Sequence, residues 1–408
     1  MTIGSILPFV FLSLAHASLA ENWTEFRGPT KQGHATGNSF PTRWSDTQNV
    51  AWKRQLPGSG WSSPIHVDGR VYLTTADSAD GPLSLRTLCL DASSGDTIWN
   101  KQVFSISDPK NIHNKNSNAS PTPVFENGRL YIHFGHMGTA CLNLEGDPIW
   151  TNTGLAYPPV HGNGGCPEIS GDHLIFSCDG ARDPFVVALD KNTGKIAWKK
   201  PRSSDAKKKF SFSTPLTIEV DGKKQLVTCG SNIVQALDPQ TGEEIWHVNY
   251  TGYSVVPRPV FAHGLVYIST SFDNPVAMAI RPDGSGDVSE THVAWTAPKR
   301  APNTPSTLVV GDEFYMVSDG GIVSCLDAKS GKIHYQERAS GPVSASPLYA
   351  GGHIYIQDER GKAVVLKPGK EFKVVAENDL DEKSLASYGV GQACLFIRTE
   401  SHLYRIGR

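Results

Sequence analysis

The residues of this chain that could carry chemistry fall in two groups of loops. The indole of Trp61 could stack on a planar ligand, and the guanidinium groups of Arg258 and Arg300 could each bind a carboxylate through two hydrogen bonds. The carboxylates of Asp179 and Asp319 have the oxygen chemistry of a general base or of a Ca²⁺ ligand. Three further polar side chains that could orient a ligand accompany them: His161, Asn163 and Asn303. These residues predict a polar pocket with an aromatic floor, and the alternative is that they are ordinary loop tips in which Asp and Asn serve as turn residues.

Motifs of other enzyme classes are missing from the sequence. The glycine-rich stretch that begins at His161 (His-Gly-Asn-Gly-Gly) opens a strand and has no Lys or helix after it, so we do not expect it to bind phosphate. The chain contains no Gly-x-Ser-x-Gly and no His-Glu-x-x-His. With 38 Lys and Arg against 40 Asp and Glu, the formal charge is −2, which predicts no nucleic-acid partner.

A repeated phrase places these loops. The motif Leu-Asp-x-x-x-Gly-x-x-x-Trp ends at Trp99, Trp198 and Trp246, and imperfect copies of it end at Trp150 and Tyr335. A repeat of roughly 40–50 residues that contains only short strands and turns is typical of a β-propeller. Alternating apolar runs joined by Asp-Gly or Asn-Gly turns predict four antiparallel strands in each repeat.

Eight repeats can be counted from their first strands. The last repeat has three strands and lacks a fourth, whereas residues 49–53 form a fourth strand without the three that should precede it. We therefore predict an all-β fold, an eight-bladed β-propeller of four-stranded antiparallel blades over residues 49–408, closed by the N-terminal strand joining the C-terminal blade. In such a ring the fourth-to-first and second-to-third loops share one face around the channel mouth, where the candidate residues should gather.

The N-terminal segment has two predicted parts. Residues 1–20 are apolar and end in Ser-Leu-Ala, which indicates a signal peptide and an exported protein, periplasmic or extracellular, that starts near Glu21. The apolar run is shorter than the roughly 20 residues of a membrane span, so we expect no transmembrane segment. Residues 21–48 carry four large aromatic side chains and should lie as a strap on the propeller. The chain has 7 cysteines, and a Cys166–Cys178 disulfide remains open.

The repeat resembles the tryptophan-docking repeat of quinoprotein alcohol dehydrogenases and that of the outer-membrane assembly lipoprotein of the Bam complex. The stretches that begin at Trp23 (Trp-Thr-Glu-Phe-Arg-Gly-Pro) and at Gly60 (Gly-Trp-Ser-Ser-Pro) are similar to secreted PQQ-like repeat proteins. The adjacent Cys-Cys pair of the quinoproteins and the Cys-x-x-Cys-His of attached haem are not present, and neither is a lipid-bearing Cys near the predicted cleavage site.

Three functions therefore stand open. The first is a monomeric, non-catalytic propeller that binds a protein, peptide or glycan on its loop face. The second, which the resemblance implies, is an alcohol or aldose oxidoreductase that uses pyrroloquinoline quinone (PQQ) with Ca²⁺. The third is a scaffold for envelope assembly.

Overall fold

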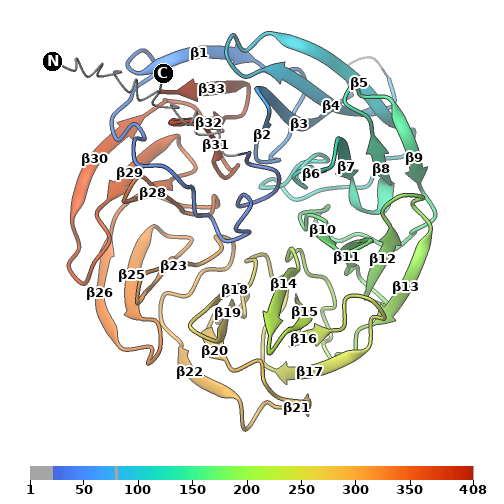
Figure 1. The fold of residues 1–408 in the computed structure, drawn as a ribbon, viewed down its shortest axis with the longest axis vertical. Helices are drawn as coiled ribbons and strands as arrows, with labels where there is room; N and C mark the ends of the chain where they lie inside the picture. Colours follow the sequence, from blue (N-terminus) through green and yellow to red (C-terminus); the bar gives the residue numbers. More distant parts are fainter. Residues whose placement is uncertain (1–21, 79–80, 408) are drawn as a thin grey trace, which may run out of the picture.

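The computed structural model describes residues 22–78 and 81–407. These residues form a ring of eight sheets around a central channel, with the strands of each sheet stacked from the channel outward (Figure 1). The fold prediction is confirmed. The predicted signal peptide, residues 1–20, lies outside the described residues.

In the first seven blades the strands run from innermost to outermost in chain order, and the eighth blade takes its outermost strand from the N-terminal part of the chain. The first two blades contain β2 (Ile65–Val67), β3 (Arg70–Asp77), β4 (Leu83–Asp91) and β5 (Thr97–Ile106), then β6 (Val124–Glu126), β7 (Arg129–His133), β8 (Thr139–Leu142) and β9 (Pro148–Asn152). The next two contain β10 (Glu168–Ser170), β11 (His173–Cys178), β12 (Phe185–Asp190) and β13 (Ile196–Pro201), then β14 (Leu216–Val220), β15 (Lys223–Gly230), β16 (Ile233–Leu237) and β17 (Glu244–Asn249). The fifth and sixth contain β18 (Val260–Ala262), β19 (Leu265–Ser269), β20 (Ala277–Ile280) and β22 (Val293–Ala297), then β23 (Leu308–Val310), β24 (Glu313–Val317), β25 (Ile322–Asp327) and β26 (Ile333–Arg338). The last two contain β27 (Leu348–Ala350), β28 (His353–Gln357), β29 (Lys362–Leu366) and β30 (Val374–Asp379), then β31 (Gly389–Gly391), β32 (Cys394–Arg398) and β33 (His402–Ile406).

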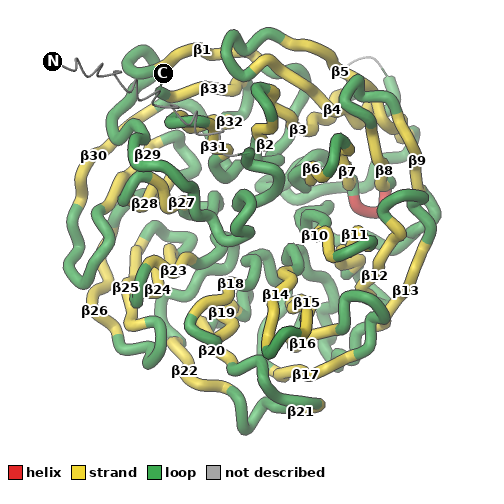
Figure 2. The backbone as a smooth tube through the Cα atoms, viewed as in Figure 1, coloured by secondary structure: helices red, strands yellow, loops and turns green. Residues whose placement is uncertain are grey.

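Two small elements lie outside this pattern. Strand β21 (Gly286–Asp287) pairs in parallel with β17, and a 3₁₀ helix, η1 (Gly135–Met137), follows β7 (Figure 2). No helix among the described residues is long and apolar enough to cross a membrane.

The ring closes through its two chain ends. Strand β1 (Val50–Gln55) is the outermost strand of the eighth blade and pairs antiparallel with β33. This pairing leaves no blade without its fourth strand, so the ring has no open side at which another chain could add a strand.

The recurring Trp docks each blade to the next. Trp52 donates its indole N–H to the carbonyl of Ala92 (3.0 Å), and Trp198 donates to the carbonyl of Pro239 (3.1 Å), which follows the Asp of the next repeat. The indole covers the Gly of that same turn. Gly242 has φ +75°, and a Cβ there would stand 2.6 Å from Trp198 Cε3, so the turn requires glycine for its conformation and for the contact.

Trp246 departs from this pattern because the fifth blade lacks the Leu-Asp turn. Its indole N–H donates to Gln225 Oε1 (2.8 Å), and Gln225 Nε2 donates to the carbonyl of Pro282 in the fifth blade (3.1 Å). One amide side chain therefore transmits the contact that a backbone carbonyl makes elsewhere.

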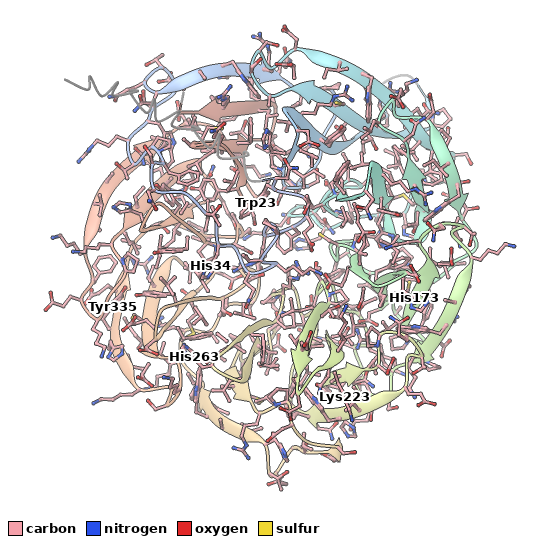
Figure 3. The ribbon with its side chains drawn as sticks, viewed as in Figure 1. Trp23, His34, His173, Lys223, His263 and Tyr335 are labelled. Atoms are coloured by element: carbon pink, nitrogen blue, oxygen red, sulfur yellow. The ribbon has the colours of Figure 1, made fainter. Side chains whose placement is uncertain are left out.

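Residues 22–48 cross the channel before the first strand begins. Trp23 exchanges both backbone hydrogen bonds with His66 of β2, and the carbonyl of Thr24 accepts from the N–H of Phe125 in β6. Farther along, Tyr349 of β27 donates to the carbonyl of Gly33. These contacts fall on the middle residues of innermost strands, whose inner edge has no neighbouring strand. The segment, which we call the strap, thus satisfies backbone groups of several blades at once, and the region around the labelled Trp23 and His34 lies near the centre of the ring (Figure 3).

All seven cysteines are buried free thiols. Cys166 precedes β10 and is not joined to Cys178 of β11. Cys89, Cys141 and Cys325 occupy core positions, as small buried residues would.

Candidate functional site

A cavity of about 550 Å³ occupies the channel on the face of the fourth-to-first and second-to-third loops. Phe26 of the strap lines its base, and Trp61 lines its wall beside the first blade. The strap therefore stands at the base of the cavity, and the loops form its mouth.

Aromatic rings form a continuous arc around the second to fifth blades. His113 meets His161 edge-on with ring centroids 5.3 Å apart, and His161 meets Phe210 at 5.3 Å. Phe210 contacts Tyr253 (5.8 Å), which contacts Phe272 (6.2 Å). We call these five residues the aromatic arc. Burial, with a smaller contribution from His113, lowers the pKa of His161, which keeps this imidazole neutral at pH 7 and suited to contact with apolar groups.

The opposite wall is polar. Asp319 accepts hydrogen bonds from the backbone N–H of Asn303 (2.6 Å) and from the hydroxyl of Thr304 (2.8 Å). Burial raises the pKa of Asp319, and these two hydrogen bonds offset part of the effect. The ammonium of Lys115 reaches Glu359 (2.7 Å) at the same mouth.

A ring of side chains stands deeper in the channel, at the residue two positions before each innermost strand. In six blades that residue is Ser or Thr and lines the cavity: Ser63, Thr122, Thr214, Ser306, Ser346 and Ser387. In most of the ring, each backbone N–H donates to the side chain of the next blade, as Ser346 N–H does to Ser387 Oγ (2.9 Å). We call these six hydroxyls the crown.

Cys166 and Arg258 occupy the two remaining positions of the ring. The thiol of Cys166 accepts from the N–H of Thr122 (3.2 Å), as a crown hydroxyl would. Arg258 has no such side-chain acceptor to offer, and its guanidinium turns toward the strap instead.

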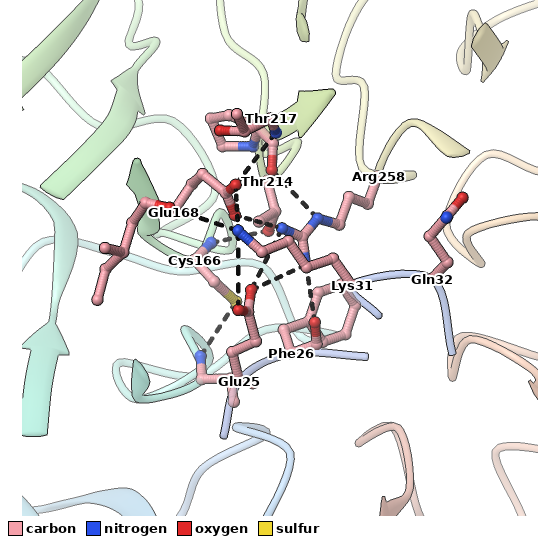
Figure 4. A network of polar contacts seen from close by, with 12 residues as sticks. Glu25, Phe26, Lys31, Gln32, Cys166, Glu168, Thr214, Thr217 and Arg258 are labelled. Atoms are coloured by element: carbon pink, nitrogen blue, oxygen red, sulfur yellow. Dashed lines mark hydrogen bonds and ion pairs between the residues drawn. The ribbon is translucent and has the colours of Figure 1, made fainter. Parts of the chain in front are cut away.

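Arg258 fastens the strap to the blades (Figure 4). Its guanidinium donates to Glu168 Oε2 (2.6 Å), to Glu25 Oε2 (3.4 Å) and to the carbonyl of Phe26 (2.8 Å). Lys31 Nζ reaches the other oxygen of Glu168 (2.6 Å). Burial and the nearby Glu168 raise the pKa of Glu25 to about 7, although Lys31 and Arg258 act in the opposite direction. We call Arg258, Glu168, Glu25 and Lys31 the clamp.

Asp179 is bound in a second buried ion pair. Arg202 Nε lies 2.7 and 2.9 Å from its two carboxylate oxygens, and both side chains are almost fully buried. Arg202 Nη2 also donates to Thr228 Oγ1 (2.9 Å) in the fourth blade, so the pair joins two blades. Burial raises the pKa of Asp179, and Arg202 offsets part of that rise.

The structure brings four of the residues predicted from sequence to the cavity wall: Trp61, His161, Asn303 and Asp319. Asn163 lies beside the cavity rather than on it, where it accepts from the hydroxyl of Tyr157 (2.7 Å) and donates to the carbonyl of Phe134 (3.0 Å). Arg258 is held in the clamp, and Arg300 is an exposed loop residue outside the cavity lining.

Sequence reasoning missed Phe210, Tyr253 and the crown. The two aromatic residues stand in fourth-to-first loops, where an aromatic residue among polar neighbours was the available signal. The crown leaves a repeated Ser/Thr-Pro in the sequence, seen at Ser63, Thr122, Thr214 and Ser346.

The cavity wall does not fit a Ca²⁺–quinone centre. Ca²⁺ takes 6–8 oxygen ligands in proteins, whereas Asp319 is the one carboxylate among the residues that line the cavity, and two protein donors already occupy it. Across residues 22–78 and 81–407, no group of three or more His, Cys, Asp and Glu side chains is placed to share a metal ion.

Comparison with known proteins gives a consistent fold. A family model described as outer membrane protein assembly factor BamB matches residues 42–153, 86–308 and 289–370. BamB from Moraxella catarrhalis superposes with a TM-score of 0.63 at 13% identity, covering 88% of this chain and 97% of that one. A europium-containing methanol dehydrogenase superposes with a TM-score of 0.72 at 11% identity, covering 93% of this chain and 90% of that one. At these identities the likeness shows the fold alone.

Curated relatives match shorter stretches. A quinoprotein ethanol dehydrogenase of Pseudomonas aeruginosa is 43% identical over 88 residues, which are 19% of this chain and 14% of that protein. The outer membrane protein assembly factor BamB of Yersinia pestis is 27% identical over 189 residues, which are 43% of this chain and 44% of that protein. The chain thus spans less than half the length of these curated relatives.

Proposed function

The chain belongs to the family described as outer membrane protein assembly factor BamB, and on that premise we propose that it is an exported, non-catalytic propeller that binds a protein partner. The partner inserts a polypeptide segment into the cavity on the loop face. The observation that carries this proposal is the aromatic arc, which lines one side of a cavity of about 550 Å³ beneath a broad loop surface.

The arc has the chemistry of a protein-binding site. Aromatic side chains supply large contact area at low cost in conformational entropy and are enriched among the residues that dominate binding energy. The polar wall around Asp319 and Asn303 provides donors and acceptors that a peptide backbone can use. We favour a polypeptide over a glycan because the family's members are named as assembly factors for outer membrane proteins.

Export is part of the proposal. The sequence of residues 1–20 supports it, and so does the family, whose named members serve the outer membrane. N-terminal sequencing of the mature protein should begin near Glu21.

The quinone-dependent oxidoreductase is the second candidate, favoured by the 43% identical stretch shared with the ethanol dehydrogenase. The donor set of the cavity argues against it. The thermal unfolding temperature of the protein with PQQ and Ca²⁺ tests it, because a ligand at 100 times its dissociation constant adds about 2.7 kcal/mol of stability.

Two substitutions in the arc region test the binding proposal. Phe212→Ala and Tyr253→Ala remove half-buried rings from the cavity wall. The matched controls are Ile196→Ala and Ile333→Ala, which remove exposed apolar side chains from outermost strands. A tagged protein should retain its partner with the control substitutions and lose it with the wall substitutions at an unchanged melting temperature. Equal retention by all four variants would contradict the proposal.

A further inference from the structure

The crown hydroxyls have a shared property that the ring itself does not use. Thr122 accepts the N–H of Ser63 (2.9 Å), Ser306 accepts that of Arg258 (3.0 Å), and Ser346 accepts that of Ser306 (3.0 Å). Thr122 and Thr214 also make side-chain hydrogen bonds with the thiol of Cys166. For the other four hydroxyls, those of Ser63, Ser306, Ser346 and Ser387, no protein acceptor within the described part of the chain receives the O–H hydrogen. A hydroxyl that accepts one bond still has its own hydrogen to donate.

The geometry of the propeller directs these hydrogens to one place. All six hydroxyls line the same cavity, and each occupies the same position relative to its innermost strand. The strap contacts the middle residue of several innermost strands, three residues farther along, which is roughly 10 Å deeper at about 3.3 Å per residue. The crown is therefore a ring of hydroxyls that lines the cavity above the level at which the strap contacts the innermost strands.

The charges beneath the crown favour an anion. The strap and clamp bring together three cations, Arg27, Lys31 and Arg258, with two carboxylates, Glu25 and Glu168. Arg27 is 3% exposed, and none of the described carboxylates contacts it. It donates to the carbonyls of Gln32 (2.6 Å) and Thr307 (2.7 Å), and its Nε and Nη1 find no hydrogen-bond partner among the described residues.

The position of Arg27 links this charge to the cavity. It follows Phe26, which lines the cavity base, and Thr307 follows the crown residue Ser306. A buried cation without a counterion raises the electrostatic potential of the low-dielectric region around it. The carboxylates nearest the mouth, Asp319 and Glu359, are each occupied by protein donors, namely Asn303 and Thr304 for Asp319, and Lys115 and Ser344 for Glu359.

We propose that the crown is a carboxylate-binding site, and that the ligand carries its carboxylate on an apolar body that packs against the aromatic arc. This inference deepens the proposed function and rests on it, because the polypeptide segment then enters the cavity with its C-terminal carboxylate foremost. The same chemistry could come from a free carboxylic acid, and the experiment separates these two sources.

The test uses the whole protein and three probes: the tripeptide acetyl-Ala-Ala-Phe with a free carboxylate, its C-terminal amide, and 3-phenylpropionate. Titration calorimetry measures the affinities. We expect the free-acid peptide to bind at least tenfold more tightly than the amide. Tighter binding of the peptide than of phenylpropionate identifies a chain terminus as the ligand, and equal binding of the two acids identifies a free carboxylic acid.

Two variants test the crown without removing its structural role. Ser346→Cys with Ser387→Cys keeps an acceptor for each neighbouring N–H, as Cys166 already does, while replacing two O–H donors by weak S–H donors. We expect at least a tenfold loss of affinity for the free-acid peptide and an unchanged melting temperature. Thr122→Ser keeps the hydroxyl and should leave affinity unchanged.

The outcome that overturns the carboxylate site is equal binding of acid and amide, or binding of neither. Retention of the protein partner by the Ser346→Cys, Ser387→Cys variant would likewise overturn this inference while leaving the proposed function in place. Loss of the partner from the Phe212→Ala variant then remains the separate test of the binding face.

Discussion

Removal of the Arg258 side chain should destabilise the protein far more than removal of Arg300. Arg258 is 1% exposed and ties the strap to the third and fourth blades through Glu25, Glu168 and backbone carbonyls. Truncation to Ala leaves Glu168, which is fully buried, with one cation fewer. Lys31 still reaches Glu168, but the two buried carboxylates then share one cation in place of two. Breaking a buried ion pair by removing one partner typically costs about 3–5 kcal/mol.

The expected change in melting temperature follows from the size of the chain. An unfolding entropy of about 2.1 cal/mol/K per residue gives about 0.9 kcal/mol/K for 408 residues. The cost of 3–5 kcal/mol therefore corresponds to a decrease of about 4–6 °C, measured by calorimetry at pH 7. Arg300→Ala is the matched control, because Arg300 is exposed and surface substitutions usually change stability by less than about 0.5 kcal/mol.

The same pair of variants can refute this reasoning. If Arg258→Ala and Arg300→Ala lower the melting temperature equally, the clamp does not hold the strap in the channel. If Arg258→Ala alone lowers it, and the free-acid peptide also binds more weakly, then the strap supports the base of the cavity as described.

Three further predictions concern the clamp, the blade turns and the second ion pair. Glu25 has its pKa raised to about 7 from an ordinary value of 4.5, so the native state binds more protons than the unfolded state between these values. The contribution of Glu25 to stability is complete below about pH 4.5 and is lost as the pH rises through 7. The melting temperature of the wild-type protein should therefore fall between pH 5 and 8, and Glu25→Gln should flatten this decline. An equal decline in the wild-type protein and in Glu25→Gln would count against the assignment. In a denaturant titration, Gly242→Ala should lower the free energy of unfolding by about 1–3 kcal/mol more than Gly264→Ala does. Both glycines have positive φ, but only Gly242 has an indole where the Cβ would stand. Equal losses of stability would mean that Trp198 moves freely. Arg202→Met should destabilise the protein by about 3–5 kcal/mol, because Asp179 then stays buried without its partner. The double variant Arg202→Met, Asp179→Leu should recover most of that loss of stability. No recovery would show that the broken ion pair is not the cause.

The architecture could be predicted from the sequence because each blade repeats the same local pattern. The Leu-Asp-x-x-x-Gly-x-x-x-Trp phrase contains both partners of the blade contact, so its spacing predicts the turn and the docked indole together. The unmatched strands at the two chain ends likewise predicted closure, because β1 and β33 complete one blade.

The site could be predicted only in part because long-range partners decide which polar residues are free. Arg258 stands two residues before an innermost strand, which is a position that faces the channel, but Glu25 lies 233 residues away in the chain and engages it. Asp179 meets Arg202 across 23 residues in the same way. No local sequence pattern predicts the pairing of Arg258 with Glu25 or of Asp179 with Arg202. A loop position alone therefore could not separate ligand-binding residues from structural ones.

The crown illustrates the opposite case. Its Ser and Thr positions recur in the sequence, but at Ser306, Ser346 and Ser387 the O–H stays free to donate because the hydroxyl oxygen accepts an N–H from the neighbouring blade. The hydrogen bond between neighbouring blades exists only in the closed ring. The sequence therefore shows which residues recur, and only the folded ring shows that their hydroxyls line one cavity.

The central claim is that the loop-face cavity holds a polypeptide segment of a partner, and site-specific photo-crosslinking tests it most directly. A photoreactive phenylalanine analogue at Phe212 or Tyr253 would stand in the cavity wall, and the same analogue at Ile196 or Ile333 would stand on the outer rim. In cells that produce the protein, we predict one adduct from the cavity positions, none from the rim, and a crosslinked peptide at or near the C-terminus of the partner. Adducts from the rim positions alone, or no adduct from the cavity, would contradict the claim.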